Sequence, residues 1–153
     1  MPNNDKNSPQ FKVAPATGKL GILIPGMGAV ASTFVAGVIA SRKGLAKPFG
    51  SVTQMGRIRI GKRSENNNPL IKDYVPLTSL DAIEFGGWDI FPDSIYEAAV
   101  KAEVLRKEHH LDPIKEELDQ IRPMKAVFSE KYIQNITGPN VKTGTLWQKA
   151  EEV

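Results

Sequence analysis

The 153-residue sequence contains no cysteine, which excludes disulfides, a thiolate nucleophile and cysteine-bound zinc. Its two histidines, His109 and His110, have no acidic or histidine partner at a metal-ligand spacing. We therefore interpret them as linker or capping residues and expect no metal site. A chain without cysteine fits a reducing compartment, so we expect a cytoplasmic protein.

The sequence also has little that would indicate secretion, and little excess charge. Residues 1–18 are polar and contain proline, with no apolar stretch behind a basic start, and they are predicted to form a flexible arm. The net charge is only +3. The one basic cluster, Arg57, Arg59, Lys62 and Arg63, has no interleaved aromatic side chains that could stack on bases. We interpret it as a solvated strand end and expect no nucleic-acid partner.

The longest uncharged segment lies between Lys19 and Arg42 and spans 22 residues, enough to cross a bilayer. However, Pro25 and neighbouring glycines interrupt it, and Ala, Ser and Thr make up much of the rest, so a membrane span is disfavoured. Two elements explain the pattern better. Residues 20–24 predict a buried parallel strand. Residues 29–42 predict a helix, which finishes with a basic last turn and is followed by a glycine.

The turn between these elements has the G-x-G-x-x-A form of the dinucleotide-binding fingerprint, Gly26-Met27-Gly28-Ala29-Val30-Ala31. The first glycine permits the tight turn, the second lets a pyrophosphate approach the backbone, and the small third residue lets the helix pack closely on the strand. The N–H groups of the first helical turn would point at the phosphates, with the Ser32 and Thr33 hydroxyls as further donors. The turn predicts a bound dinucleotide, and the alternative is an ordinary glycine-rich turn of an α/β protein.

The acidic residue that the fingerprint places about 20 residues further on is absent. Gln54 and Arg57 stand in that region instead. An arginine could accept a 2′-phosphate and so admit NADP, or the ribose could be held from elsewhere. Asp89 is the candidate for holding the ribose in place of the missing acid. It follows the predicted strand "DAIEF" and the pair Gly86-Gly87, where a doubly wound sheet presents ligand contacts. The alternative for Asp89 is a local turn or cap hydrogen bond.

The remaining segments predict further strands and helices. Residues 57–60 alternate and predict a strand with one solvated side. The polar loop "SENNNP" that follows predicts a hairpin tip or a mobile segment, and "MKAVF" predicts another short strand. A capping box of Ser94 and Glu97 opens a helix that we expect to reach about Lys107. A second helix is expected over residues 112–123, between two proline-containing pairs.

Four motifs, "GMGAVAST", "GSVTQMGRIRIGKR", "FGGWDIFPDSIYEAAVKAEVL" and "PMKAVF", occur in this order. With them the sequence resembles the amino-terminal part of the myo-inositol-phosphate synthase (inositol-3-phosphate synthase) family in its bacterial form, over about residues 17–145. The resemblance implies an α/β fold, a partial Rossmann-like NAD-binding domain with a parallel sheet. Residues 19–136 would form this part of the domain, and residues 137–153 a loop and the start of a truncated helix capped by Thr145.

This family uses tightly held NAD to oxidise glucose 6-phosphate, closes the ring by an intramolecular aldol step and returns the hydride, giving 1D-myo-inositol 3-phosphate. The resemblance thus implies an isomerase of inositol and phospholipid biosynthesis, a homo-oligomer (tetramer) when complete, with no membrane partner. It also implies that the loop from Gly26 to Thr33 wraps the pyrophosphate and that Asp89 contacts the cofactor.

Two departures from the family limit what is carried over. Ala29-Val30-Ala31 stand where eukaryotic relatives have an asparagine-containing loop, so side-chain contacts to the phosphates are not transferred. The catalytic lysines of the family lie in a later domain, so no catalytic residue is assigned, and we expect an incomplete synthase that is inactive alone. The alternatives are a stand-alone nucleotide-binding or regulatory module, or a basic nucleic-acid binder if residues 57–63 formed a continuous patch.

Overall fold

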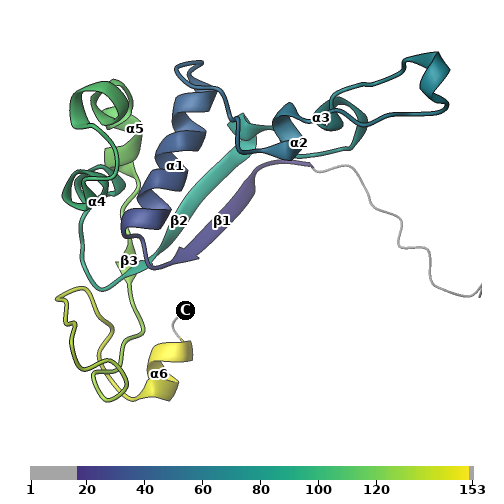
Figure 1. The fold of residues 1–153 in the computed structure, drawn as a ribbon. Coiled ribbons are helices and arrows are strands. Elements are labelled where there is room, and N and C mark those ends of the chain that lie inside the picture. Colours follow the sequence, from purple (N-terminus) through teal and green to yellow (C-terminus); the bar gives the residue numbers. More distant parts are fainter. Residues whose placement is uncertain (1–16, 152–153) are drawn as a thin grey trace, which may run out of the picture.

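The computed structural model describes residues 17–151, and its centre is a three-stranded parallel sheet in the order β1-β2-β3 (Figure 1). The strands are β1 (Leu20–Pro25), β2 (Ile83–Asp89) and β3 (Met124–Lys125). β1 pairs with β2 along its whole length, whereas β3 pairs only with the last two residues of β2. Residues 1–16 of the expected amino-terminal arm lie outside the described residues.

The predicted parallel strand, turn and helix at the start of the described chain are confirmed, but the strand is not buried as expected, because its residues alternate between exposed and half-buried. α1 is Ala29–Arg42. Its carboxyl end is closed by Gly44 at φ +70°, whose N–H donates to the Ser41 carbonyl at 3.1 Å, while the Leu45 N–H donates to the Ala40 carbonyl at 2.9 Å. This pair of bonds satisfies carbonyls that the last helical turn leaves unpaired, and it requires the left-handed backbone that glycine adopts at least cost.

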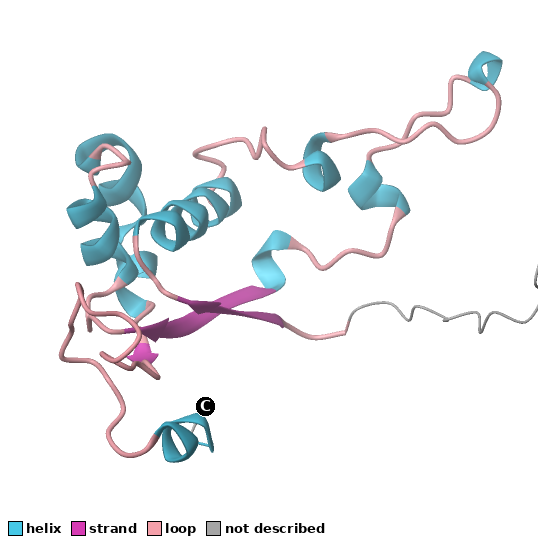
Figure 2. Cartoon of the chain, turned by 60° about the horizontal axis from the view of Figure 1, so that its bottom comes forward, coloured by secondary structure: helices cyan, strands magenta, loops and turns pink. Residues whose placement is uncertain are grey.

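Three helices cover one face of the sheet, α1, α4 (Ile95–Ala102) and α5 (Lys115–Gln120) (Figure 2). Phe85 of β2 packs against the core between these helices and meets Phe34 edge-on, with ring centroids 5.7 Å apart. Leu23 of β1 belongs to the opposite face, because strand side chains alternate, and it is 60% exposed. The core includes Val35, Ile39, Ile95, Ala99, Leu111, Ile114 and Leu118.

α4 begins at the predicted capping box but ends earlier than predicted. The Ser94 N–H donates to Glu97 Oε2 at 2.7 Å, and the Glu97 N–H donates to Ser94 Oγ at 3.2 Å. The helix was expected to reach about Lys107, yet it ends at Ala102, and Glu103 adopts the left-handed region at φ 54°. The chain turns back at this point.

The early end of α4 has a packing reason. A π-helical turn, Lys107–Leu111, and a 3-10 turn, Asp112–Ile114, lead the chain into α5, which stops before the predicted proline boundary. A straight extension of α4 would carry this segment into solvent, whereas the turn completely buries three apolar side chains, Leu111, Ile114 and Leu118. The last described helix is α6, Leu146–Glu151, where Gln148 N–H donates to Thr145 Oγ1 at 3.3 Å, as its predicted cap requires.

The connection between α1 and β2, residues 43–82, forms an arm that projects from the body (Figure 1). The strand predicted over residues 57–60 is wrong, because these residues form no regular strand. Arg57 makes an isolated antiparallel bridge with Leu70, because the alternating segment pairs with residues just beyond its own hairpin tip. The predicted tip is confirmed. The arm also contains short helical segments, α2 (Val52–Met55), η1 (Arg63–Glu65), α3 (Ile71–Tyr74) and η2 (Leu80–Ala82).

Candidate nucleotide-binding site

The glycine turn lies at the carboxyl end of β1, and each of its three small residues has a separate structural setting. Gly26 has φ +90°, and its N–H donates to the Trp88 carbonyl at 2.8 Å, so the turn starts while β1 is still bonded to β2. A Cβ atom on Gly28 would meet no protein atom within 4 Å. Ala31 is buried where α1 packs on the sheet. The surrounding protein therefore does not require glycine at position 28. Close approach of a ligand would require it, because a side chain would occupy that space.

The amino terminus of α1 presents unpaired N–H groups beside Gly28. The helix has no side-chain cap and no acidic residue in its first turn. The N–H groups of Ala29, Val30 and Ala31 are therefore without intrahelical acceptors, and they coincide with the positive end of the helix dipole. Val30, in this first turn, is 86% exposed. The arrangement suits an anion such as a pyrophosphate.

The two hydroxyls expected to assist at this helix end point elsewhere. Ser32 is fully buried, and its hydroxyl donates to the Ala29 carbonyl at 3.2 Å. The Thr33 hydroxyl donates to the same carbonyl at 2.7 Å. Such bonds back to the helix backbone leave neither hydroxyl directed at the turn. Any anion there would be bound by backbone N–H groups.

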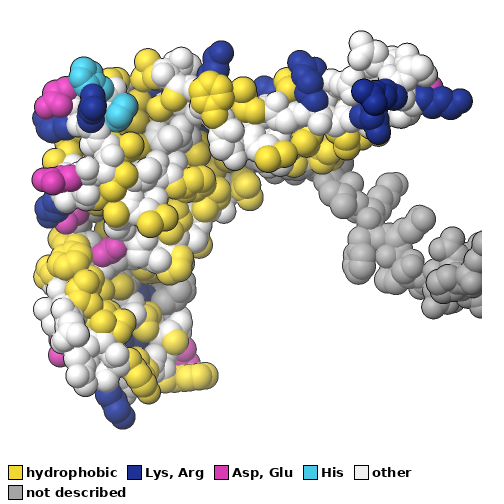
Figure 3. Space-filling view, viewed as in Figure 1, with side chains coloured by type: hydrophobic (Ala, Val, Ile, Leu, Met, Phe, Trp, Pro, Cys, Tyr) yellow, Lys and Arg dark blue, Asp and Glu magenta, His cyan; other side chains and the backbone are white. Residues whose placement is uncertain are grey.

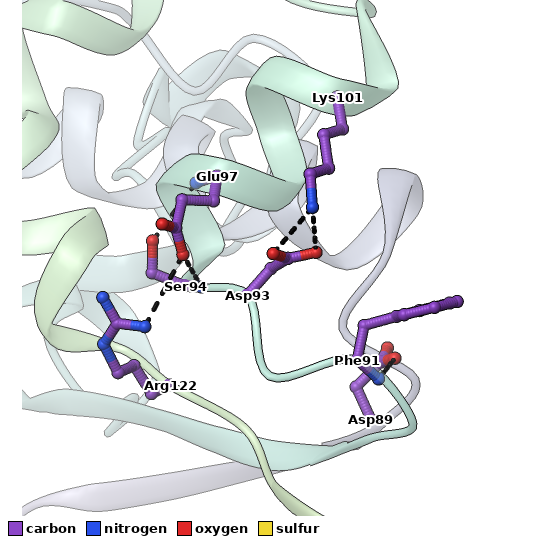
Figure 4. Close-up of polar contacts among 7 residues, drawn as sticks. All are labelled: Asp89, Phe91, Asp93, Ser94, Glu97, Lys101 and Arg122. Carbon is purple, nitrogen blue, oxygen red and sulfur yellow. Dashed lines mark hydrogen bonds and ion pairs between the residues drawn. The ribbon is translucent and has the colours of Figure 1, made fainter. Parts of the chain in front are cut away.

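Asp89 ends β2 next to the glycine turn, although the two are far apart in the sequence. Its Oδ2 accepts the Met27 N–H at 2.6 Å. Its Oδ1 accepts the Phe91 N–H at 3.0 Å, the bond drawn in Figure 4. The local hydrogen bond considered from the sequence is thus present. A carboxylate has about four acceptor positions, so it retains acceptors for a ligand hydroxyl. The structure brings Asp89 and residues 26–28 together.

The position of Asp89 explains why the fingerprint acid was not found about 20 residues after the turn. The strand beside β1 is β2, and the arm of residues 43–82 delays it in the sequence. Asp89 is the last residue of that neighbouring strand, which is where the fingerprint acid stands. Gln54 and Arg57 belong to the arm, which leaves α1 at the end opposite the glycine turn (Figure 1). Arg57 is therefore not placed to accept a 2′-phosphate at this site.

The glycine pair before Asp89 lies inside β2 rather than after it. A Cβ atom on Gly87 would stand 2.0 Å from the Ile24 carbonyl oxygen, so a side chain there would collide with β1. On Gly86 the nearest protein atom would be Leu23 Cδ2 at 3.4 Å, an ordinary contact. Gly87 thus permits the close approach of the two strands whose ends carry the turn and Asp89.

A cavity of about 590 Å³ opens at the carboxyl ends of the strands. Its wall is mainly apolar and includes Gly28, Trp88, Ile90, Phe91, Val127 and Ile136. The Phe91 ring projects beside Asp89, and on its other side a smaller hollow is bordered by the ion pair of Lys101 and Asp93, 2.6 Å apart (Figure 4). Sequence reasoning missed Phe91, Val127 and Ile136. Phe91 follows the predicted strand "DAIEF" and Val127 lies in the predicted strand "MKAVF", so both could have been found from the sequence, but nothing local marks Ile136.

Other expectations concern chemistry away from this site. His110 Nδ1 accepts the Arg106 N–H at 3.0 Å, which agrees with a capping role. Within residues 17–151 no group of three or more histidine, aspartate or glutamate side chains is arranged to hold a metal ion. No helix of this part of the chain has the length and apolar character needed to span a bilayer.

Comparisons with known proteins agree with this geometry. Residues 20–153 match the model of an NAD-binding family described as myo-inositol-1-phosphate synthase. Inositol-3-phosphate synthase 1 of Bacteroides thetaiotaomicron is 50% identical over 144 residues, which cover 93% of this chain and 33% of the relative. Inositol-3-phosphate synthase 1 of Oryza sativa is 31% identical over 158 residues, covering 94% of this chain and 31% of the relative.

A solved structure gives the same result for the fold. The crystal structure of inositol-3-phosphate synthase from Caenorhabditis elegans superposes with a TM-score of 0.75 at 27% identity, over 91% of this chain and 30% of that one. The chain spans about a third of the length of the curated relatives it matches. The fold is thus the expected Rossmann-like one, and this chain belongs to the myo-inositol-1-phosphate synthase family, in which it matches the NAD-binding domain.

Proposed function

We propose that this chain holds the adenosine diphosphate half of the NAD site of an inositol-3-phosphate synthase. The dinucleotide fold consists of two mononucleotide-binding halves, and the strand order β1-β2-β3 corresponds to one of them. The observation that carries the proposal is the Met27–Asp89 hydrogen bond, since it joins a phosphate-binding turn to the acid of the neighbouring strand.

The residues present fit the cofactor. The pyrophosphate would lie over Gly28 at the amino terminus of α1, where the backbone N–H groups of residues 28–31 would bind it. Asp89 would accept hydrogen bonds from the ribose hydroxyls, and its negative charge would repel a 2′-phosphate, which favours NAD over NADP. The apolar cavity beside Phe91 and Val127 suits the flat face of the base. Of the site residues predicted from the sequence, Ser32 would contribute only through its place in the helix.

The activity proposed for the whole protein is that of the named relatives, conversion of glucose 6-phosphate to 1D-myo-inositol 3-phosphate in the cytoplasm by a homo-oligomer. NAD supplies the hydride acceptor for the oxidation and returns the hydride after the aldol cyclisation. The residues described in this chain bind and orient the cofactor. No catalytic role is assigned to any of them.

Binding selectivity tests the cofactor proposal. Isothermal titration calorimetry on the 153-residue chain should give similar affinities for NADH and ADP-ribose, at least tenfold weaker binding of NADPH, and no binding of nicotinamide mononucleotide. NADPH binding as tightly as NADH would contradict the role given to Asp89. Failure of NADH and ADP-ribose to bind a folded chain would contradict the site as a whole.

A chimera tests the activity. Residues 20–153 would replace the matching third of the Bacteroides thetaiotaomicron relative, with which they share half of their residues. The chimera should form inositol phosphate from glucose 6-phosphate and NAD, measured by mass spectrometry, and a chimera carrying Gly28→Asp should not. A well-folded chimera that binds NAD but forms no inositol phosphate would count against the proposed activity.

A further inference from the structure

A short segment after β3 crosses the ends of β2 and β3, and Asn140 makes its contacts with both strands. The Asn140 side-chain amide donates to the Asp89 carbonyl at 2.9 Å and to the Met124 carbonyl at 3.2 Å. Its backbone N–H donates to the Ile90 carbonyl at 2.8 Å, and its carbonyl accepts the Ala126 N–H at 3.0 Å. One half-buried residue thus joins four backbone positions in two strand ends.

These bonds act where the sheet itself gives little support. β2 and β3 pair only through Trp88 with Met124 and Asp89 with Lys125. Beyond those pairs the two chains diverge around the 590 Å³ cavity, whose walls include residues 90–91 and 126–127. Gly138 adds a direct backbone contact, since a Cβ atom there would be 2.3 Å from the Ile90 carbonyl oxygen. The hydrogen bonds and contacts of residues 138–140 therefore connect β2 and β3 where the two strands no longer pair directly.

The chemistry of the contact explains the choice of side chain. Both acceptors are carbonyl oxygens, so the bridging group needs two N–H donors at the end of a short side chain. The asparagine amide provides them. An aspartate has the same shape but only acceptors when ionised, and it would place a negative charge against two carbonyl dipoles.

We infer that Asn140 is a positioning residue for the nucleotide site. By holding the Asp89 backbone at the end of β2, it directs the Asp89 carboxylate toward the Met27 N–H, and by holding Met124 and Ala126 it sets the width of the cavity. This inference rests on the proposed function, because the geometry matters to a ligand only if the nucleotide lies there.

The test compares Asn140→Asp and Asn140→Ala with a matched control, Asn135→Asp, which adds the same charge at an exposed position in the loop that precedes residues 138–140. NADH affinity is measured by calorimetry and by quenching of tryptophan fluorescence in proteins that also carry Trp147→Phe, so that the signal comes from Trp88, which lines the cavity. Both Asn140 variants should bind NADH at least tenfold more weakly than the control. In the ligand-free protein, the NMR signal of the Met27 amide should move in the Asn140 variants and not in Asn135→Asp.

The outcomes separate the inference from the proposed function. If the wild-type protein does not bind NADH, the proposed function is overturned, and so is this inference as far as it concerns ligand binding. That holds even if the NMR signal of the Met27 amide moves in the Asn140 variants. Wild-type binding with unchanged NADH affinity and an unchanged Met27 amide in both Asn140 variants overturns the inference alone, even if their melting temperatures fall. If Asn140→Asp does not fold, the result for Asn140→Ala decides whether the inference holds, because that variant keeps both backbone hydrogen bonds of residue 140.

Discussion

At the scale of single residues, Gly28 and Asp89 differ in the contacts that they make with the rest of the protein. Gly28 has open space where a side chain would stand, and Asp89 already binds two backbone N–H groups. Substitutions at these two positions should therefore separate loss of ligand binding from loss of stability.

Gly28→Asp should abolish NADH binding with little effect on stability. The new carboxylate would occupy the proposed position of the pyrophosphate and repel it, while surface changes without lost contacts usually alter the free energy of unfolding by less than about 0.5 kcal/mol. The control is Gly50→Asp, because Gly50 also has open space around its Cβ position but lies in the arm. Calorimetry and urea denaturation check both variants, and normal NADH binding by Gly28→Asp would show that the turn does not hold the phosphates.

Asp89→Ala should weaken NADH binding and also lower stability. The carboxylate bonds to the Met27 and Phe91 N–H groups are lost with the side chain, and bonds to charged groups contribute about 1.5–3 kcal/mol each. Ser94→Ala is the control for stability, since loss of this helix cap costs about 1 kcal/mol away from the site. A melting temperature lowered in both variants, with NADH affinity unchanged in both, would make Asp89 purely structural.

At the scale of elements, the site depends on how closely β1 and β2 approach each other. The glycine turn and Asp89 lie on different strands, and their hydrogen bond requires the backbone contact at Gly87. Two strand glycines with different surroundings make this dependence measurable.

Gly87→Ala should be strongly destabilising, whereas Gly21→Ala should not. A Cβ atom at Gly87 would force β1 and β2 apart, and overpacking of this kind costs about 1–3 kcal/mol or more. Gly21 lies in β1 with no atom within 4 Å of its Cβ position, so alanine there restricts the unfolded chain without a clash. Denaturation midpoints check the pair, and equal stability of the two variants would refute the close-approach argument.

At the scale of the whole molecule, the described chain leaves apolar surface open. β1 is an edge strand with Leu23 60% exposed, and Phe49 and Phe34 are 78% and 48% exposed beside a hollow along α1. Figure 3 shows hydrophobic side chains over much of the visible face, with Lys and Arg gathered toward the outer end of the arm. Exposed strand edges with apolar side chains favour association.

The 153-residue chain should therefore self-associate as its concentration rises, and Leu23→Lys should reduce this association. A lysine on an edge strand opposes pairing with another chain. Val104→Lys is the matched control, because Val104 is equally exposed at 60% but lies after α4 rather than on the sheet edge. Sedimentation velocity measures the effect. An equal reduction by both lysines would assign it to net charge, and a monomer at every concentration would contradict the prediction.

Part of this protein could be predicted from its sequence because the relevant signals are local. The apolar run of β1, the glycine turn, the start of α1, and the capping box of Ser94 and Glu97 each depend on residues within a few positions of one another. Backbone preferences and helix caps act over that range. The family resemblance, which was inferred from four short motifs, is confirmed by the family match.

Only the tertiary structure decided what depends on distant residues. The alternation at residues 57–60 indicated an extended segment but not its partner, and α4 ended early because Leu111 and Ile114 had to reach the core. Asp89 and Asn140 lie at the candidate site because strand pairing brings them to the edge where the glycine turn lies. The sequence alone determined the local elements and the turn that would bind phosphate. The fold decided which acid faces that turn, because contacts across a sheet are set by packing and register, which no local pattern records.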